Sequence, residues 1–192
     1  YHKAIISGNP WLSYNKSQVQ GSDSSITKPK TWDLFSTKAL ISMQPIEGFF
    51  PKALLAAMAT TSEVLWLIRP HPKMMGDIEK IKTLLDKAGV DYELEYAAEQ
   101  NLYLLFKEID LNITYWSSVA YESISFGVPT MIAHPNGAEI MSEYLTAGVF
   151  MQGLSKEEIL AGLKEPRMNP ETSTYIEVDA KLIRNAFAES IA

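Results

Sequence analysis

Cysteine is absent from the 192-residue sequence, which excludes disulfide bonds, cysteine nucleophiles and zinc sites built on thiolates. Histidine is scarce, and the three histidines, His2, His71 and His134, lack the spacing of a metal centre. We therefore expect no metal and no other cofactor. The lack of cysteine also suits a reducing compartment.

Long apolar runs and clusters of basic residues are missing too. No stretch reaches the roughly 18 to 20 apolar residues that a membrane span needs, and residues 1–12 lack the basic start and apolar middle of a signal peptide. A net charge of −6 without a Lys/Arg run argues against a nucleic-acid partner, although one local positive site could still bind an anion. We therefore expect a cytoplasmic protein with no membrane span and no nucleic-acid partner.

The composition that remains is that of a folded domain. Hydrophobic residues make up 46% of the sequence and charged residues 21%, which argues against extensive disorder. The length suits one domain with a full core. The sequence begins at Tyr1 directly in the strand-like KAIIS, which is consistent with a fragment of a longer protein.

The chain divides into three parts. Residues 1–13 contain a strand pattern and a segment like those that link two domains, and residues 14–36 are polar and lack periodicity, which predicts a loop or linker. Residues 37–192 alternate strand and helix patterns and form the predicted domain. The strand patterns lie at residues 38–45, 63–72, 90–96, 111–115 and 128–133. The helical patterns lie at residues 49–62, 75–88, 100–110, 117–126, 155–163 and 175–192.

Continuous apolar strands that alternate with helices are typical of a parallel sheet covered by helices on both faces. We therefore predict a doubly wound, Rossmann-like α/β domain. Local signals mark two helix ends within it. Gly89 is a candidate C-cap, and Ser155 with Glu158 three residues later forms a candidate capping box.

Polar residues follow four of the predicted strands. They are Gln44 after the first strand, Arg69-Pro70-His71-Pro72 after the second, Tyr115 to Ser118 after the fourth, and His134 to Gly137 after the fifth. Ligands of open parallel sheets bind beyond the carboxyl ends of the strands, so these stretches should converge on one edge.

Arg69 and His71 stand in a loop that Pro70 and Pro72 stiffen, and rigid donors lose little entropy when they bind an anion. A histidine can also donate from its ring to a phosphate. The alternative is a proline-rich loop whose histidine only faces solvent.

Ser117 and Ser118 stand where a helix follows a strand, and a helix N-terminus with an added hydroxyl can hold a phosphate. A plain helix cap explains the pair equally well. Glu122 lies one turn later on the same face and could accept hydrogen bonds from a ribose diol, or it could be a solvated charge. His134 is equally ambiguous, and Tyr115 could stack on a base or pack in the core.

Taken together, the RPHP motif and the later SSVAYESISFGVPTMIA resemble the C-terminal, nucleotide-binding half of GT-B glycosyltransferases. More narrowly, they resemble the branch that uses cytidine-activated donors, the bacterial sialyl and Kdo transferases with His-Pro and Ser-Ser motifs. The GNPWL stretch near the start is similar to the Gly-Asn-Pro found where many GT-B chains cross from the first domain to the second.

The resemblance implies a donor-binding domain of an enzyme that moves a sugar from a nucleotide, CMP in this branch, to a glycan acceptor in surface-polysaccharide synthesis. The nucleotide-sugar would be a substrate, and an N-terminal acceptor domain absent from this chain would supply the general base. His71 of the His-Pro motif would contact the nucleotide and stabilise the leaving group. Ser117 and Ser118 would hold the phosphate, and Glu122 would touch the ribose.

Three alternatives stay open. The domain could bind a glycan or a partner without catalysis, or it could belong to a UDP-sugar epimerase, which shares the GT-B architecture but needs carboxylates spread over two domains. The related CDP-glycerol glycerophosphotransferases commonly carry an Asp before the aromatic neighbour of the serine pair. Here Thr114-Tyr115-Trp116 contains no acid, which disfavours that option.

Overall fold

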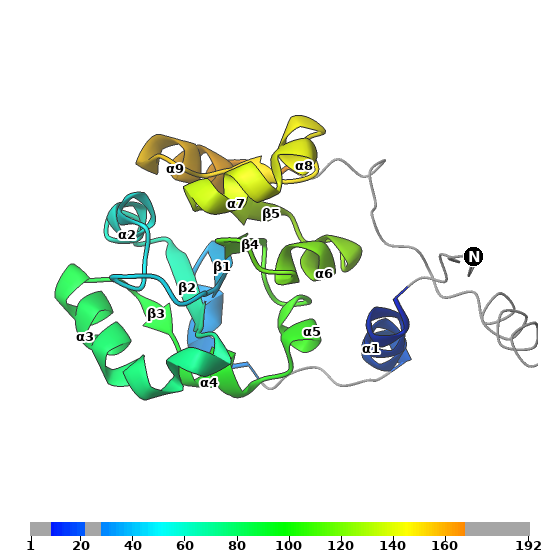
Figure 1. The fold of residues 1–192 in the computed structure, drawn as a ribbon. Helices are drawn as coiled ribbons and strands as arrows, with labels where there is room; N and C mark the ends of the chain where they lie inside the picture. The colour runs from blue at the N-terminus through cyan, green and yellow to red at the C-terminus, as the bar shows by residue number, and fades with distance from the viewer. Residues whose placement is uncertain (1–8, 22–27, 168–192) are drawn as a thin grey trace, which may run out of the picture.

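The computed structural model describes residues 9–21 and 28–167, which Figure 1 draws as a coloured ribbon. These residues form one sheet of six parallel strands in the order β3-β2-β1-β4-β5-β6. The strands are β1 Thr37–Ser42, β2 Val64–Arg69, β3 Tyr92–Glu93, β4 Leu111–Thr114, β5 Thr130–Ile132 and β6 Met151–Gln152. The predicted Rossmann-like α/β fold is confirmed.

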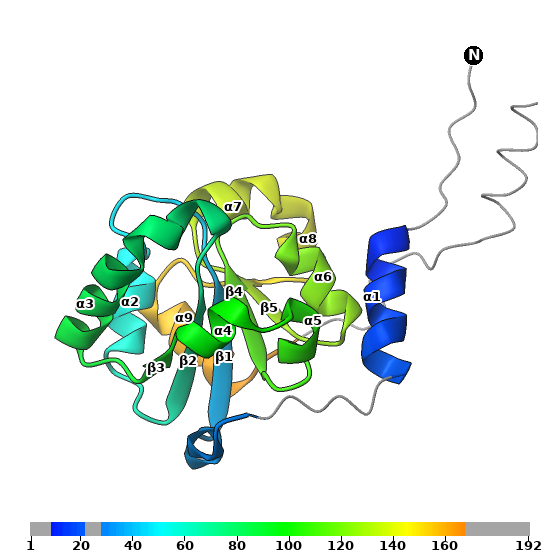
Figure 2. The same ribbon diagram turned by 90° about the horizontal axis from the view of Figure 1, so that it is seen from below.

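Helices cover both faces of this sheet. They are α1 Pro10–Gly21, the 3-10 helix η1 Lys30–Leu34, α2 Lys52–Met58, the 3-10 helix η2 Pro72–Asp77, α3 Ile78–Ala88, α4 Glu95–Glu99, α5 Leu102–Leu105, α6 Val119–Ser125, α7 Pro135–Ile140, α8 Ser142–Thr146 and α9 Lys156–Lys164. Helices α2, α3 and α9 pack on one face, and α4 and α5 pack on the other with α1 against α5 (Figure 2).

The side chains of successive strand residues lie on opposite faces of the sheet. Ile41 and Ile68 pack in the core under α2, α3 and α9, whereas Leu40 and Leu67 pack in the core under α4 and α5. All four side chains are fully buried. Because both faces are covered, residues 39–41 of β1 and 64–68 of β2 are all apolar, which is why the sequence showed continuous runs instead of alternation.

Both predicted helix ends are confirmed. Gly89 ends α3 in the left-handed conformation, with φ of 66°, a conformation that glycine adopts without steric cost. The N-cap Ser155 accepts a hydrogen bond from the backbone N–H of Glu158 at 3.1 Å, and the Glu158 carboxylate accepts one from the N–H of Ser155 at 3.0 Å. This capping box fixes the start of α9.

Helix α1 is the main departure from the predicted elements, because the loop expected from residue 14 is helical as far as residue 21. Pro10 suits the first helical turn, and Asn9 caps it by accepting from Leu12 N at 3.1 Å. Leu12 and Val19 are buried against the α5 side, and Lys107 donates to Val19 O at 2.6 Å. Tertiary packing therefore makes this polar stretch helical.

Smaller departures concern short elements. The predicted strand 90–96 is reduced to Tyr92–Glu93 because α4 begins at Glu95, and β6 was not predicted. The strand and helix patterns expected in residues 1–8 and 175–192 lie outside the described residues, and the division of the chain at residues 13 and 36 stays a prediction. No helix within residues 9–21 and 28–167 is long and apolar enough to cross a membrane.

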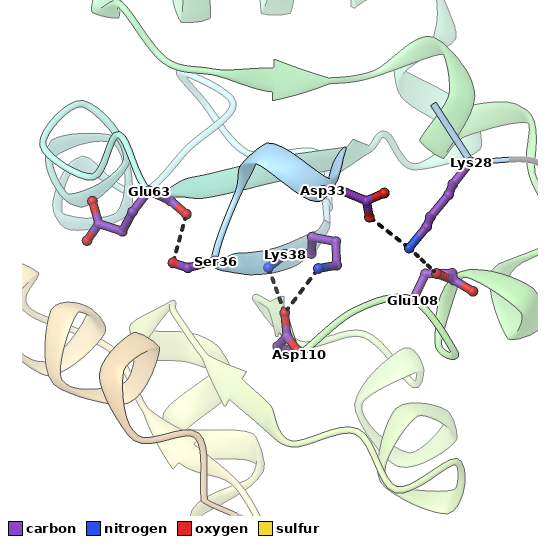
Figure 3. Close-up of polar contacts among 7 residues, drawn as sticks. All are labelled: Lys28, Asp33, Ser36, Lys38, Glu63, Glu108 and Asp110. Atoms are coloured by element: carbon purple, nitrogen blue, oxygen red, sulfur yellow. Dashed lines mark hydrogen bonds and ion pairs between the residues drawn. The ribbon is translucent and has the colours of Figure 1, made fainter. Parts of the chain in front are cut away.

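The amino edge of the sheet is tied together by charged side chains (Figure 3). Asp110, which precedes β4, accepts from the backbone N–H of Lys38 in β1 at 2.8 Å. Lys28 lies between Asp33 and Glu108, at 3.1 and 3.5 Å. The polar residues predicted to form a site all lie at the opposite, carboxyl edge.

Candidate functional site

The four predicted polar stretches follow strand ends that lie side by side. Ser42 at the end of β1 is paired with Arg69 of β2 on one side and with Thr114 of β4 on the other, and Thr114 is paired with Ile132 of β5. Gln44, His71, Trp116 and His134 each lie two residues beyond these positions. The expected convergence of the strand ends on one edge is therefore present in the structure.

A buried polar network supports this edge from below. Asn112 of β4 accepts from the Ser42 hydroxyl at 2.9 Å and donates to the Ser123 hydroxyl at 3.2 Å. Ser123 lies on α6 and also hydrogen-bonds Thr130 of β5. These side chains are at most 4% exposed, so each needs its partner. The network fixes α6 over β4 and β5. The sequence analysis missed it, although an Asn within an otherwise apolar strand is a signal that could have identified it.

His71 is a helix cap. Its Nδ1 accepts a hydrogen bond from the backbone N–H of Lys73 at 3.2 Å, at the start of η2, and the exposed Pro72 occupies the first position of that helix. In the neutral ring the proton is then on Nε2, which is left as a donor. The sequence predicted that the prolines would hold His71 rigidly. In the structure the helix cap holds the ring of His71 in place.

His134 repeats the arrangement on β5. Its Nδ1 accepts from the backbone N–H of Asn136 at 3.1 Å at the start of α7. The ring lies 4.7 Å from that of Trp116 in an edge-to-face contact. Burial lowers the pKa of His134, so the ring is neutral at pH 7 and carries its proton on Nε2. Two histidine caps therefore flank the serine pair.

The serine pair lies between these histidines in the fold. The Ser117 hydroxyl accepts from the backbone N–H of Val119 at 3.3 Å, so this serine satisfies part of the α6 N-terminus itself. Ser118 is exposed, directly precedes α6, and makes no side-chain cap. Ser118 is thus the hydroxyl that is open to a ligand.

Two of the predicted site residues have other contacts. Tyr115 is fully buried and donates from its hydroxyl to the backbone oxygen of Phe49 at 2.9 Å, so its interpretation as a base-stacking residue is wrong. Arg69 directs Nη1 to the backbone oxygens of Ala97 and Gln100, at 2.6 and 2.8 Å. The sequence predicted that Arg69 would contact an anion, whereas in the structure this nitrogen hydrogen-bonds protein backbone. Burial lowers the pKa of Arg69.

Glu122 and Gln44 are both partly enclosed. The Glu122 carboxylate accepts from the Tyr103 hydroxyl at 2.8 Å, so it is not a freely solvated charge. The side-chain oxygen of Gln44 is buried in the loop after β1, and no donor in the described part of the chain reaches it. Gln44 therefore lies at the predicted edge with no assigned contact.

The loop between β1 and α2 adds a cavity that the sequence did not indicate. Gly48 and Phe49 both have positive φ, 75° and 65°, and the bond from Tyr115 holds the strained Phe49 in place. The loop and the start of α7 border an open cavity of about 530 Å³. The lining includes Ile46, Glu47, Phe50, Lys52, His134 and Leu154. Lys52 and His134 thus line the same cavity.

Helix α7 is pressed against the end of β4. A Cβ atom at Gly137 would lie 1.6 Å from the backbone oxygen of Tyr115, so only glycine permits this approach. The approach sets the position of His134 relative to Trp116. In the described residues no group of three His, Asp or Glu side chains could hold a metal ion.

Comparison with known proteins gives structural likeness only. No family model and no curated protein matches the sequence. A protein assigned as a UDP-N-acetylglucosamine 2-epimerase from Listeria monocytogenes matches with a TM-score of 0.63 at 17% identity, over 97% of this chain and 53% of its own. The glycotransferase of kitacinnamycin matches with a TM-score of 0.52 at 12% identity, over 86% of this chain and 42% of its own.

The chain thus spans about half the length of the first of these structures. At such identities the likeness establishes the fold, in which six parallel strands with flanking helices agree with the Rossmann-like half of a GT-B protein.

Proposed function

We propose that this chain is the donor-binding domain of an enzyme that acts on a nucleotide-activated sugar. The observation that carries the proposal is the row of neighbouring strand ends, which gathers two histidine caps and an exposed serine above a rigid polar network. The Nε2–H groups of the two histidines and the serine hydroxyl offer hydrogen-bond donors to an anionic group without a metal.

The first candidate reaction is glycosyl transfer from a CMP-linked donor to a glycan acceptor in polysaccharide synthesis. Negative charge grows on the phosphate as the sugar leaves, and donors fixed before the reaction stabilise that charge best. In this proposal His71 Nε2 and the Ser118 hydroxyl contact the phosphate, Glu122 contacts the ribose, and a second domain binds the acceptor and carries the general base. The motifs of the sequence, and not the fold, favour CMP.

The second candidate is epimerisation of a UDP-sugar. It is favoured by the likeness to the protein assigned as an epimerase, which covers 97% of this chain and has the higher TM-score of the two structures compared. The same carboxyl edge would bind UDP. Incubation of the full-length protein with UDP-N-acetylglucosamine, followed by analysis of the sugar product, distinguishes this reaction from transfer.

Calorimetric titration of the chain with CMP, CDP, UDP and GDP tests the shared part of both candidates. Saturable binding to at least one nucleotide is expected, and binding to none of the four contradicts the proposal.

Two variants test the assigned contacts, His71→Asn and Ser118→Ala. His71→Asn keeps a good helix cap but removes the Nε2 donor.

A hydrogen bond to a charged group contributes about 1.5–3 kcal/mol, so His71→Asn and Ser118→Ala should each weaken binding roughly 10- to 100-fold. Ser142→Ala is the matched control, since Ser142 is also an exposed serine at a helix start but lies on α8, away from the row of strand ends. Its affinity should equal that of the wild type.

A further inference from the structure

We propose that Arg69 and Tyr103 are positioning residues that fix the Glu122 carboxylate for a ribose diol, and so make the site selective for ribonucleotides. This inference rests on the proposed nucleotide site. The structural basis is a continuous series of contacts that starts at the end of β2, runs through α4 and α5, and ends on α6.

The series begins with two hydrogen bonds from one guanidinium nitrogen. Arg69 Nη1 donates to the backbone oxygens of Ala97 and Gln100, the last part of α4 and the residue that caps it. The final carbonyls of a helix have no partner within the helix, so the cation both satisfies and orients them. The junction between α4 and α5 is therefore tied to the sheet.

The next residue, Asn101, starts α5. Its side-chain oxygen accepts from the backbone N–H of Tyr103 at 2.9 Å, and its backbone oxygen accepts from Leu104 and Leu105 at 3.1 Å. Helix α5 has only one turn, so its direction follows from this cap and from the junction that Arg69 holds.

Tyr103 connects α5 to α6. Its ring stacks on Phe126 at 5.3 Å and meets Phe106 edge-on at 6.1 Å, and only 6% of the residue is exposed. Burial and the Glu122 carboxylate raise the pKa of Tyr103 to about 12, so the hydroxyl keeps its proton at neutral pH.

Glu122 is the end of the series. One carboxylate oxygen accepts from Tyr103 at 2.8 Å, and the residue lies one helical turn after Ser118 on the same face. A carboxylate restrained through one oxygen keeps lone pairs for further donors and loses little entropy when it binds them. The two hydroxyls of a ribose are such donors, whereas a 2′-deoxyribose lacks one of them.

The test compares CMP with 2′-deoxy-CMP, and UDP with 2′-deoxy-UDP, by calorimetry on the whole chain. The wild type should bind the ribonucleotide at least about 10-fold more tightly. Tyr103→Phe keeps the ring contacts but removes the hydroxyl, and it should reduce this ratio roughly 3- to 10-fold with little effect on the deoxynucleotide.

Arg69→Met should reduce the same ratio, and Arg69→Lys, which retains a cationic donor, should restore part of it. Tyr121→Phe is the control, since Tyr121 lies on α6 in ring contacts with Tyr144 and Phe150. It should leave the ratio unchanged. A loss of stability alone would weaken binding of both nucleotides equally, so only a change in the ratio supports a positioning role.

The outcomes separate the two proposals. If the wild type binds no nucleotide, the proposed function fails and this inference fails with it. If the wild type binds nucleotides without preferring the ribose form, or if folded Tyr103→Phe retains the full preference, the inference is overturned while the nucleotide site stands. Should Arg69→Met fail to fold, the Tyr103→Phe ratio decides alone.

Discussion

The contact between α7 and the end of β4 yields a prediction whose size can be worked from one distance. In Gly137→Ala the new Cβ would lie 1.6 Å from the backbone oxygen of Tyr115 and 2.8 Å from Ile132 Cγ2. Carbon–oxygen contacts are tolerated down to about 3.3 Å, so α7 must move away by roughly 1.7 Å. The obstructing atom is a backbone oxygen directly after the central strand β4, so it has little freedom to yield.

Overpacking of this kind costs about 1–3 kcal/mol, and the rigid neighbour places this case near the upper end. For a domain of this size 1 kcal/mol lowers Tm by about 2–4 °C, so Gly137→Ala should lower it by about 6–12 °C. The displacement also moves His134 away from Trp116. Nucleotide affinity measured below the transition should therefore fall as well.

Thermal unfolding followed by far-UV circular dichroism is the assay, with Gly76→Ala as the matched control. Gly76 has an ordinary φ and open space where its Cβ would be, so alanine there should leave Tm within a few degrees. If Gly137→Ala unfolds at the same temperature as Gly76→Ala, α7 does not lie against Tyr115 and the geometry assigned to His134 is refuted.

Three further predictions concern stability. Asn112→Leu leaves the buried hydroxyls of Ser42 and Ser123 without their amide partner and should cost about 2 kcal/mol in urea unfolding, so an unchanged midpoint would rule out the network. Because the pKa of His134 lies below its ordinary value of 6.5, the unfolded chain binds the proton more readily. Stability should be full above pH 6.5 and decline as the pH falls below it, and His134→Asn, which retains a helix cap, should flatten this profile in a Tm series. Ser155→Ala removes the capping box of α9 and should cost about 1 kcal/mol, a loss that chemical unfolding would reveal and whose absence would contradict the cap.

The sequence identified the sheet well because its signals there are local. The runs around Leu40 and Leu67 are apolar at residues 39–41 and 64–68, and the structure covers both of their faces. Gly89 and the Ser155 capping box also act within a few residues of their own positions. Helix α1 escaped prediction because its stability comes from α5 and Lys107, which lie far along the chain.

The candidate site was harder to predict from the sequence because the role of each residue depends on contacts with residues far away in the chain. Nothing near Tyr115 in the sequence shows that its hydroxyl donates to Phe49, 66 residues earlier. Arg69 finds its acceptors 28 and 31 residues later, and a guanidinium after a strand gives no hint whether it will meet backbone or ligand. The capping by His71 and His134 was missed because histidine is not among the usual N-cap residues.

The two outermost strands, β3 and β6, have only two residues each. An exposed strand edge offers unpaired backbone groups that can recruit a strand from another molecule, and the risk grows with the length of that edge. Here the long, apolar strands β1 and β2 lie inside the sheet, and the rims are too short to template such pairing. The order of the strands thus protects a very hydrophobic sheet against aggregation, so concentrated samples of the chain should stay free of intermolecular β-structure.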